Sequence, residues 1–348
     1  MTVNRRTLLK SAGALAFLGL THHVQAAVNH LTTDSLSWDG LPPMPFVAQE
    51  IYPAVFKGEI YVGGGFTVSD TPSFHGLAPS KDVAVFTPDN QTWRKGPSLP
   101  EARHHFGMAS TGSHLFGIGG YASVTGNAWQ AQKSVLKLDQ NTQEWQQGPS
   151  LPLPLAESVY ATVGQTIHVI GGRTVNTDTG RNVDTGKHYI LTDQHKWEEA
   201  APATIARNSA ACAVHDGKIY VFGGRAYKND IPNQQFAEVY DPKTDSWTII
   251  RPLPVAMAGI SASAFGGKIY IFGGEIFGPK GNWKAGKALN TVWCYDPAKD
   301  EWQQDGLMPT PRHGHGSVTT GDAIYIMGGA AKVGPQETLA SCYKVQKS

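Results

Sequence analysis

Three arginines stand at one fixed distance from a tryptophan in this sequence. Arg103, Arg207 and Arg312 each follow a tryptophan by ten residues. A guanidinium group presents its donors as a planar fork, which matches the oxygens of a carboxylate or a phosphate. Arginines that recur at one repeated position and meet at one place would hold an anion. The spacing therefore predicts that these three arginines bind an acidic ligand.

Acid–base groups occur at two further repeated positions, two residues after the arginine position and directly after a pair of glycines. A carboxylate or an imidazole beside a bound anion can transfer a proton, so these groups are candidates for catalysis. The alternative is that glutamates and arginines pair with one another in a structural ring of ion pairs. The residues at these positions include Glu50, His105, Glu157, Arg173, Arg225 and Glu275. We predict that the catalytic residues are Glu275, Glu157 and His105, and that further ligand-binding residues are Arg173 and Arg225.

Four histidines fall near the same repeated positions, and one of them is His105. His313 and His315 are two residues apart on an expected strand, so their side chains share one side of it. Imidazoles can ligate a metal, but acidic partners do not occur at a recognisable spacing around them. We therefore predict that His104, His313 and His315 contribute to ligand binding, with no metal and no cofactor.

These positions belong to a repeat that is recognised by a nine-residue motif, which occurs six times in the chain. Two copies are "DGKIYVFGG" at Asp216–Gly224 and "GGKIYIFGG" at Gly266–Gly274, and every copy closes on two glycines. The first glycine follows a tryptophan by 26 residues in all six copies. Runs of β-branched and aromatic residues between turn residues indicate strands, and four short strands in each repeat of 50 to 55 residues indicate a propeller blade. We predict an all-β fold, a six-bladed β-propeller with four antiparallel strands per blade.

The two ends of the chain indicate how the ring closes. The last repeat ends in "ASCYKVQKS" without a tryptophan, whereas Trp38 has no blade before it. We therefore expect "LSWDG" at Leu36–Gly40 to form the outer strand of the sixth blade, so that one propeller domain spans residues 27–348. The long, varied loops all fall between the second and third strands of the blades and hence on one face, which is where we expect the ligand.

The glycine pair, followed by a tyrosine (Tyr240, Tyr295, Tyr343) and then a tryptophan, resembles the kelch repeat. The layout is also similar to that of the periplasmic kelch proteins that interconvert the anomers of sialic acid, the N-acetylneuraminate mutarotases. This resemblance implies a mutarotase or epimerase acting on a sugar acid. Glu275 resembles a glutamate of that family, whereas the arginine expected a few residues later is absent and only Lys280 and Lys284 stand nearby.

Two other functions are compatible with a kelch propeller. Kelch propellers also bind acidic peptides through arginines of the inner strand, so the alternative is a non-catalytic module that recognises an exported protein or a glycan. A copper radical oxidase of the galactose oxidase type would need a tyrosine–cysteine crosslink. Cys212, Cys294 and Cys342 do not lie in suitable loops, and we expect them to be unpaired.

Residues 1–26 resemble a twin-arginine signal peptide. Arg5 and Arg6 precede the apolar run Ser11–Leu20, and the small residues of "VQAA" are placed for cleavage after Ala26. This predicts a periplasmic or secreted protein, and the run is too short for stable membrane insertion. With 29 basic and 28 acidic residues and no polybasic run, the chain lacks the cluster of basic residues that is typical of a nucleic-acid-binding surface. We expect a monomer.

Overall fold

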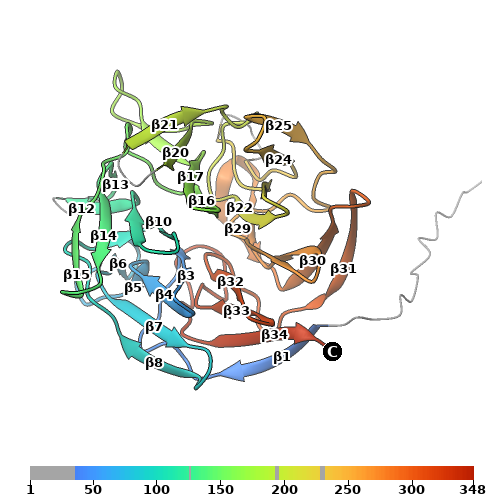
Figure 1. The fold of residues 1–348 in the computed structure, drawn as a ribbon, viewed down its shortest axis with the longest axis horizontal. Helices are drawn as coiled ribbons and strands as arrows, with labels where there is room; N and C mark the ends of the chain where they lie inside the picture. The colour runs from blue at the N-terminus through green and yellow to red at the C-terminus, as the bar shows by residue number, and fades with distance from the viewer. Residues whose placement is uncertain (1–35, 125–126, 193–195, 228–231) are drawn as a thin grey trace, which may run out of the picture. The chain divides into compact units, whose positions relative to one another are not determined.

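The computed structural model describes residues 36–348 apart from 125–126, 193–195 and 228–231. The predicted signal peptide, residues 1–26, lies outside the described residues. Six antiparallel four-stranded blades are arranged around one axis (Figure 1), which confirms the predicted six-bladed propeller. Within the described part of the chain no helix is long and apolar enough to cross a membrane.

Each blade runs from an inner strand at the axis to an outer strand at the rim. Blades 1 to 3 consist of β3 (Ala54–Phe56), β4 (Glu59–Gly63), β7 (Val83–Thr87) and β8 (Thr92–Lys95); β10 (Phe106–Ser110), β11 (Leu115–Ile118), β14 (Val135–Asp139) and β15 (Glu144–Gln147); and β16 (Val159–Val163), β17 (Thr166–Ile170), β20 (His188–Thr192) and β21 (Lys196–Ala200). Blades 4 to 6 consist of β22 (Ala211–His215), β23 (Lys218–Phe222), β24 (Ala237–Asp241) and β25 (Ser246–Ile249); β26 (Ser261–Phe265), β27 (Lys268–Phe272), β30 (Thr291–Asp296) and β31 (Glu301–Leu307); and β32 (Gly316–Thr320), β33 (Ala323–Met327), β34 (Cys342–Lys347) and β1 (Leu36–Leu41).

The long loops between the second and third strands carry small hairpins of their own on one face of the disc. These hairpins are β5 (Phe66–Val68) with β6 (Leu77–Pro79), β12 (Tyr121–Val124) with β13 (Asn127–Ala131), β18 (Arg173–Val175) with β19 (Asn182–Asp184), and β28 (Glu275–Gly278) with β29 (Asn282–Ala288). Two short inner segments, β2 (Ile51–Tyr52) and β9 (Arg103–His104), pair with β10 and β12. We call this side the loop face and the opposite side the turn face.

The N-terminal strand closes the ring, as predicted. β1 pairs antiparallel with β34 over six residues, from Leu36 opposite Lys347 to Leu41 opposite Cys342. Strands from the two ends of the chain therefore share blade 6, and both lie at the same place on the rim (Figure 1). The three cysteines are unpaired, so hydrogen bonds and packing hold this closure.

The glycine pairs join each blade to the next. All twelve of these glycines have positive φ. The N–H of the second glycine of every pair donates, at 2.8–3.0 Å, to the carbonyl of the residue ten positions after the tryptophan of the same blade, where the chain enters the next blade. A Cβ on the first glycine would lie only 2.3–3.0 Å from that same oxygen. Gly329 makes this bond to Ala48 and so links blade 6 to blade 1. Glycine is required because any side chain would push the neighbouring blades apart.

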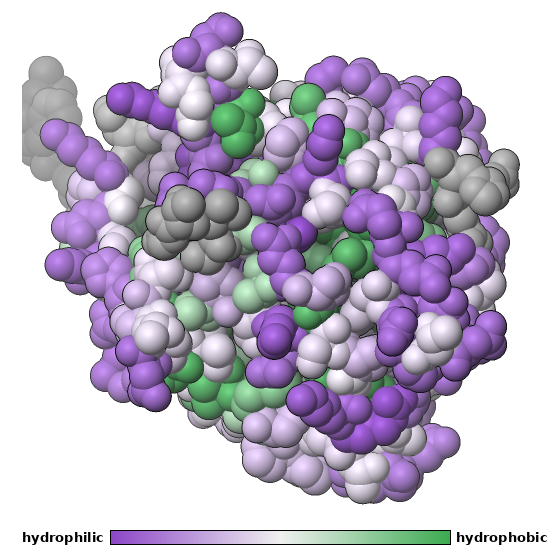
Figure 2. Space-filling model, turned by 90° about the vertical axis from the view of Figure 1, so that its left-hand side faces the viewer, coloured by the Kyte–Doolittle hydropathy of each residue, from purple (hydrophilic) through white to green (hydrophobic). Residues whose placement is uncertain are grey.

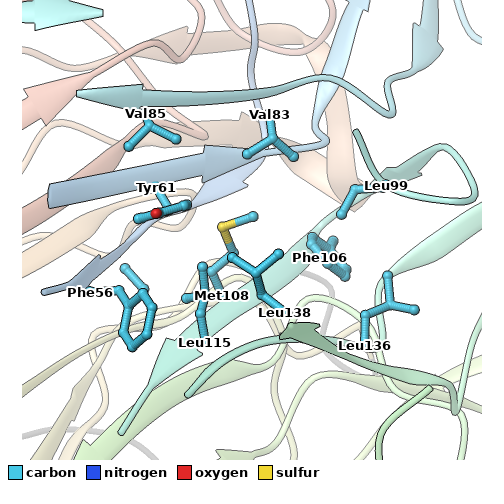
Figure 3. Close-up of a cluster of buried hydrophobic side chains, with 11 residues drawn as sticks. Phe56, Tyr61, Val83, Val85, Leu99, Phe106, Met108, Leu115, Leu136 and Leu138 are labelled. Atoms are coloured by element: carbon cyan, nitrogen blue, oxygen red, sulfur yellow. The ribbon is translucent and has the colours of Figure 1, made fainter. Parts of the chain in front are cut away.

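The tryptophans pack between blades. The indole N–H of Trp93 donates to the carbonyl of Pro42 at 2.9 Å, and that of Trp145 to Pro97 at 2.8 Å. Beside these indole rings, apolar side chains of adjacent blades pack against one another. Figure 3 shows the cluster between blades 1 and 2, in which Tyr61 and Val85 face Met108 and Leu138. Hydrophilic residues cover most of the side of the disc seen in Figure 2.

Candidate functional site

The loop face holds a cavity of about 290 Å³ above the central channel. Its wall comes from the loops of all six blades and from the start of the inner strands. The residues that line it are Gln49, Glu50, Phe66, Phe74, His105, Trp129, Glu157, Arg173, Arg225, Tyr227, Glu275, Phe277, Trp283, Gly334 and Pro335. Charged groups and large aromatic rings thus share one enclosure, which is typical of sites for polar small molecules.

The floor of the cavity is a ring of six residues, one from each blade, which we call the neck ring. Each stands twelve positions after its tryptophan and has a left-handed backbone, with φ between 48° and 61°. Five backbone hydrogen bonds of 2.6–3.2 Å connect neighbours around the ring. Its members are Glu50, His105, Glu157, Ser209, Gly259 and Gly314.

Strain in the neck ring coincides with polar side chains. A left-handed conformation costs a non-glycine residue about 1–3 kcal/mol and persists where the surroundings impose it, often at functional sites. Blades 1 to 4 nevertheless have glutamate, histidine, glutamate and serine in this conformation. Glycine in blade 6 leaves room for one of them, because a Cβ on Gly314 would lie 2.7 Å from a carboxylate oxygen of Glu50. The left-handed backbone by itself would favour glycine at these positions. We infer that blades 1 to 4 have other residues there because their polar side chains are needed.

A second ring lies above the neck ring and consists of the residues that follow the glycine pairs. Backbone bridges fix these residues against the start of the inner strand, for example Arg173 against Ala156 and Glu275 against Ala258. Arg225 occupies the same position in blade 4 and bridges to Asn208. The repeat thereby places Arg173, Arg225 and Glu275 around the cavity, as predicted from their position after the glycines.

Glu50 lies between two imidazoles. The Nε2 atom of His105 is 3.1 Å from one Glu50 oxygen, and Nδ1 of His313 is 3.6 Å from the other. Burial alone would raise the pKa of Glu50, but the two imidazoles outweigh it and hold that pKa well below its usual value. Burial likewise opposes protonation of both histidines, yet the carboxylates raise the pKa of His105, and Glu275 and Glu50 raise that of His313 to about 9. His313 is therefore cationic at neutral pH, and pairing with Glu50 favours the cationic form of His105.

Glu275 is fully engaged with cations and backbone. Its carboxylate accepts hydrogen bonds from Arg225 and, at 2.9 Å, from the N–H of Gly334, and it lies 3.5 Å from Nδ1 of His313. The Arg225 guanidinium also stacks 4.0 Å above the ring of Phe277. Both charges are buried, so this is an internal ion pair. The catalytic role of Glu275 stays a prediction; in this arrangement its carboxylate is held by three polar contacts, from Arg225, Gly334 and His313.

Glu157 differs from the other carboxylates of the cavity because its hydrogen-bond partners are neutral. It accepts a hydrogen bond of 2.9 Å from the Tyr121 hydroxyl and one of 2.7 Å from the Ser209 hydroxyl. Nearby, Arg173 donates from Nη2 to the carbonyl of Asn182. Its Nε lies 3.5 Å from Asp184 but makes no hydrogen bond. Glu157 is thus the carboxylate of the cavity wall without a cationic hydrogen-bond partner, and Arg173 lies beside it with a carboxylate that it does not hydrogen-bond.

Aromatic rings form the wall of the cavity around these charges. Phe66 stacks on Phe74 with centroids 5.4 Å apart, and Trp129 meets the edge of both rings. On the other side the Arg173 guanidinium lies 4.9 Å from the ring centroid of Tyr227. Flat apolar faces next to hydrogen-bonding groups suit a ligand with one apolar and one polar side, such as a sugar ring.

The predicted convergence of Arg103, Arg207 and Arg312 on the channel mouth is wrong. These guanidinium groups are buried inside their own blades and do not line the cavity. Arg103 and Arg312 donate to the carbonyls of Gly119 and Gly328, and Arg207 pairs with buried Glu238 at 2.9 Å. The repeat fixed their position around the ring, but their side chains turn into the blade, where they satisfy backbone carbonyls at the base of the loop. The alternative of a ring of ion pairs between these arginines and Glu50 or Glu157 is wrong for the same reason.

The other predicted histidines occupy separate layers. His104 stacks on Phe66 at 3.8 Å, and its Nε2 bonds the carbonyl of Ala128. Its Nδ1 lies 2.7 Å from Nδ1 of His105, so the two imidazoles share a hydrogen bond while the ring of His104 supports the aromatic wall. His315 lies on the channel side, where Nε2 bonds the Ser261 hydroxyl. Burial holds the pKa of His104 and His315 well below the usual value, so both are neutral.

The sequence-based prediction found the charged groups of the cavity and missed most of its uncharged ones. Ser209, Phe66 and Tyr121 stand at the neck-ring and post-glycine positions, so the repeat could have indicated them. Trp129 and Trp283 lie in loops of variable length, where no repeated spacing indicates which residues will face the cavity. Within the described residues, no group of three or more histidine, cysteine or acidic side chains could hold a metal ion.

The chain matches models of kelch repeats over most of its length. Residues 157–344 match the KLHDC2/KLHL20/DRC7 Kelch-repeats domain, and residues 102–152 match the Kelch motif. The solved structure of YjhT is similar to this propeller with a TM-score of 0.72, covers 88% of this chain and 99% of its own, and has 15% sequence identity. At this identity the likeness concerns the fold.

Several curated proteins are similar in sequence. Kelch-like protein terF of Aspergillus terreus is 27% identical over 61% of this chain and 46% of its own length. Kelch-like protein 35 of Mus musculus is 24% identical over 85% of this chain and 37% of its own, and Beta-scruin of Limulus polyphemus is 26% identical over 45% and 17%. The chain spans less than half the length of these relatives.

Proposed function

We propose that this chain, which belongs to the kelch-repeat family, binds a small sugar acid in the cavity on the loop face and interconverts the anomers of this sugar. The cavity carries the proposal because the kelch fold does not by itself specify a ligand. The observation that carries this proposal is the pair formed by Glu157 and Arg173. Glu50 and Glu275 pair with cations of the cavity wall and its surroundings, whereas Glu157 accepts hydrogen bonds only from two hydroxyl groups. Arg173 has Asp184 at 3.5 Å from its Nε but makes no hydrogen bond to this carboxylate.

Arg173 is positioned to take the carboxylate of the ligand. Its guanidinium is held flat against Tyr227 and belongs to a side chain that is about one-fifth exposed, so an entering anion can reach it. A guanidinium–carboxylate pair in a partly dehydrated cavity is stronger than one in water. The aromatic wall would pack against the carbon-bound hydrogens of the sugar ring.

The proposed chemistry is the opening and closing of a pyranose ring. Glu157 accepts the proton of the anomeric hydroxyl while the bond between the anomeric carbon and the ring oxygen breaks and a carbonyl forms. Protonated Glu157 then gives this proton to the released ring oxygen, because both ring nitrogens of His105 are occupied by Glu50 and His104. The bond between the carbonyl carbon and the neighbouring carbon of the former ring then rotates. The reverse transfers, from the chain hydroxyl to Glu157 and from Glu157 to the carbonyl oxygen, close the other anomer. All atoms and charges balance without a cofactor.

Binding is tested by titration calorimetry with N-acetylneuraminate and galacturonate. Replacing Arg173 by alanine is expected to weaken binding about 10- to 100-fold, the range for a lost charge-assisted hydrogen bond. Arg181→Ala is the matched control, because Arg181 is an exposed arginine at the end of the same hairpin loop. Equal affinities for wild type and Arg173→Ala would contradict the assignment of the carboxylate.

Catalysis is tested by exchange NMR of the anomeric protons of galacturonate, and by exchange between the ring 3-methylene signals of the two anomers of N-acetylneuraminate. We expect Glu157→Gln to bind the sugar acid within a few-fold of wild type but to reduce the enzyme-dependent exchange rate by at least 100-fold, because the amide cannot accept the proton. Binding without any acceleration of exchange by the wild-type protein would instead identify a recognition module for sugar acids.

A further inference from the structure

The β28–β29 hairpin stands at the rim of the cavity. Its Trp283 lines the cavity and meets the ring of His75 from the blade 1 loop edge to face, with centroids 5.7 Å apart. On its other side a Cβ on Gly334 would lie 2.8 Å from the indole, so glycine in the blade 6 loop makes room for the ring. Trp283 therefore fixes this hairpin against the loops of two other blades.

The hairpin is basic on its exposed side. Lys280, Lys284 and Lys287 are exposed, and none of them has an ion pair within the described part of the chain. The one acid of the hairpin, Glu275, is buried in the cavity and paired with Arg225. The Nζ atom of Lys284 is 5.6 Å from the centroid of the Trp283 ring, which places this ammonium group directly beside the cavity.

The excess of positive charge extends over the loop face. Across the described residues, the six loops that follow the glycine pairs carry ten basic and five acidic residues, whereas the rest of the propeller carries fifteen basic and twenty acidic residues. The loops are residues 66–81, 121–133, 173–187, 225–236, 275–290 and 330–341. A chain that is nearly neutral as a whole thus presents a cationic face around its cavity, which attracts polyanions.

The size of the cavity limits what can enter it. About 290 Å³ is at the lower end of the range of ligand pockets, which starts near 300 Å³, and accommodates one sugar residue. The neck ring lies between this cavity and the central channel, so a longer ligand extends outward past the rim. There it would meet Trp283 and the three lysines.

We propose that the ligand is the end of an anionic oligosaccharide, with the terminal sugar acid in the cavity and the next acidic residues against Lys280, Lys284 and Lys287. This inference rests on the proposed function. Anomer exchange needs a free anomeric hydroxyl, so the end that enters is the reducing end. Three exposed ammonium groups match the spaced carboxylates of such a chain and give a binding contribution that salt screens.

The test compares galacturonic acid with its linear tetramer on the full-length protein by titration calorimetry at low and at high salt. We expect the tetramer to bind at least tenfold more tightly than the monosaccharide at low salt, and this advantage to shrink at high salt. In the triple variant Lys280→Gln, Lys284→Gln, Lys287→Gln the advantage disappears while the affinity for the monosaccharide stays unchanged. A control triple variant at Lys57, Lys243 and Lys299, which are exposed on the turn face, keeps the advantage.

The outcomes separate this inference from the proposed function. If the monosaccharide binds and depends on Arg173, but the tetramer binds no more tightly or the lysine variant keeps the advantage, the oligosaccharide assignment is overturned. If a hexa-aspartate peptide binds as tightly as the tetramer with the same lysine dependence, the loop face recognises acidic peptides and the assignment is overturned as well. If neither galacturonate nor N-acetylneuraminate binds, the proposed function itself fails.

Discussion

Arginine occupies two repeated positions in this propeller, and the two sets have opposite environments. Arg103, Arg207 and Arg312, ten residues after a tryptophan, are buried inside their blades and bond backbone carbonyls or a buried carboxylate. Arg173 and Arg225, directly after a glycine pair, line the cavity. The comparison teaches that a repeated position determines the direction of a side chain as well as its place around the axis. The same residue type therefore bonds groups inside a blade at one position and lines the cavity at the other.

The largest expected effect comes from breaking a blade arginine. Arg207→Ala leaves the buried carboxylate of Glu238 without its guanidinium, and we expect the free energy of unfolding to fall by about 3–5 kcal/mol, measured by chemical denaturation. The double variant Arg207→Met, Glu238→Leu should recover much of this loss because no buried charge remains unpaired. Sugar-acid affinity of the folded Arg207→Ala protein should not change. A tenfold loss of affinity without a loss of stability would reverse the comparison.

A change of pH distinguishes the ion pairs of the cavity from those of the blades. The pKa of His313 is raised to about 9, so its pairing with Glu50 and Glu275 stabilises the fold fully below the ordinary histidine pKa of about 6.5, and this stabilisation is lost as pH rises through about 9. We expect the stability difference between wild type and His313→Gln to shrink by on the order of 2 kcal/mol from pH 6 to pH 10. Denaturation curves at both pH values measure it, and a difference that does not depend on pH would show that His313 is neutral in the fold.

The smallest expected effect comes from replacing the planar guanidinium of Arg173 by the ammonium group of lysine. Arg173→Lys keeps the positive charge but loses the bidentate geometry and the stacking on Tyr227. We expect sugar-acid affinity to fall by about three- to tenfold, which is less than for Arg173→Ala, with the free energy of unfolding unchanged within about 0.5 kcal/mol. Calorimetry beside Arg181→Lys as control measures this. An affinity equal to that of wild type would mean that charge alone is recognised.

Most of the fold could be predicted because it depends on local, repeated signals. Each glycine pair is needed where one blade's N–H meets the next blade's carbonyl, and each tryptophan fills the gap between blades, so both leave a regular trace in the sequence. The closure by β1 followed from counting strands at the two ends. The neck ring was visible as a position, since glutamate or histidine stood there in three blades.

The sequence by itself therefore determined the number of blades, the closure, the face that carries the loops and the repeated positions of Glu157 and Arg173. Only the tertiary structure decided which charges are free. Two features depend on groups that different blades bring together. One is whether a guanidinium turns into its blade or toward the axis, and the other is whether a carboxylate pairs with cations, as Glu275 does with Arg225 and His313, or only with hydroxyl groups, as Glu157 does. The physical reason is that electrostatic pairing acts through space between distant parts of the chain, whereas the repeat encodes only what each blade needs to contact its neighbour.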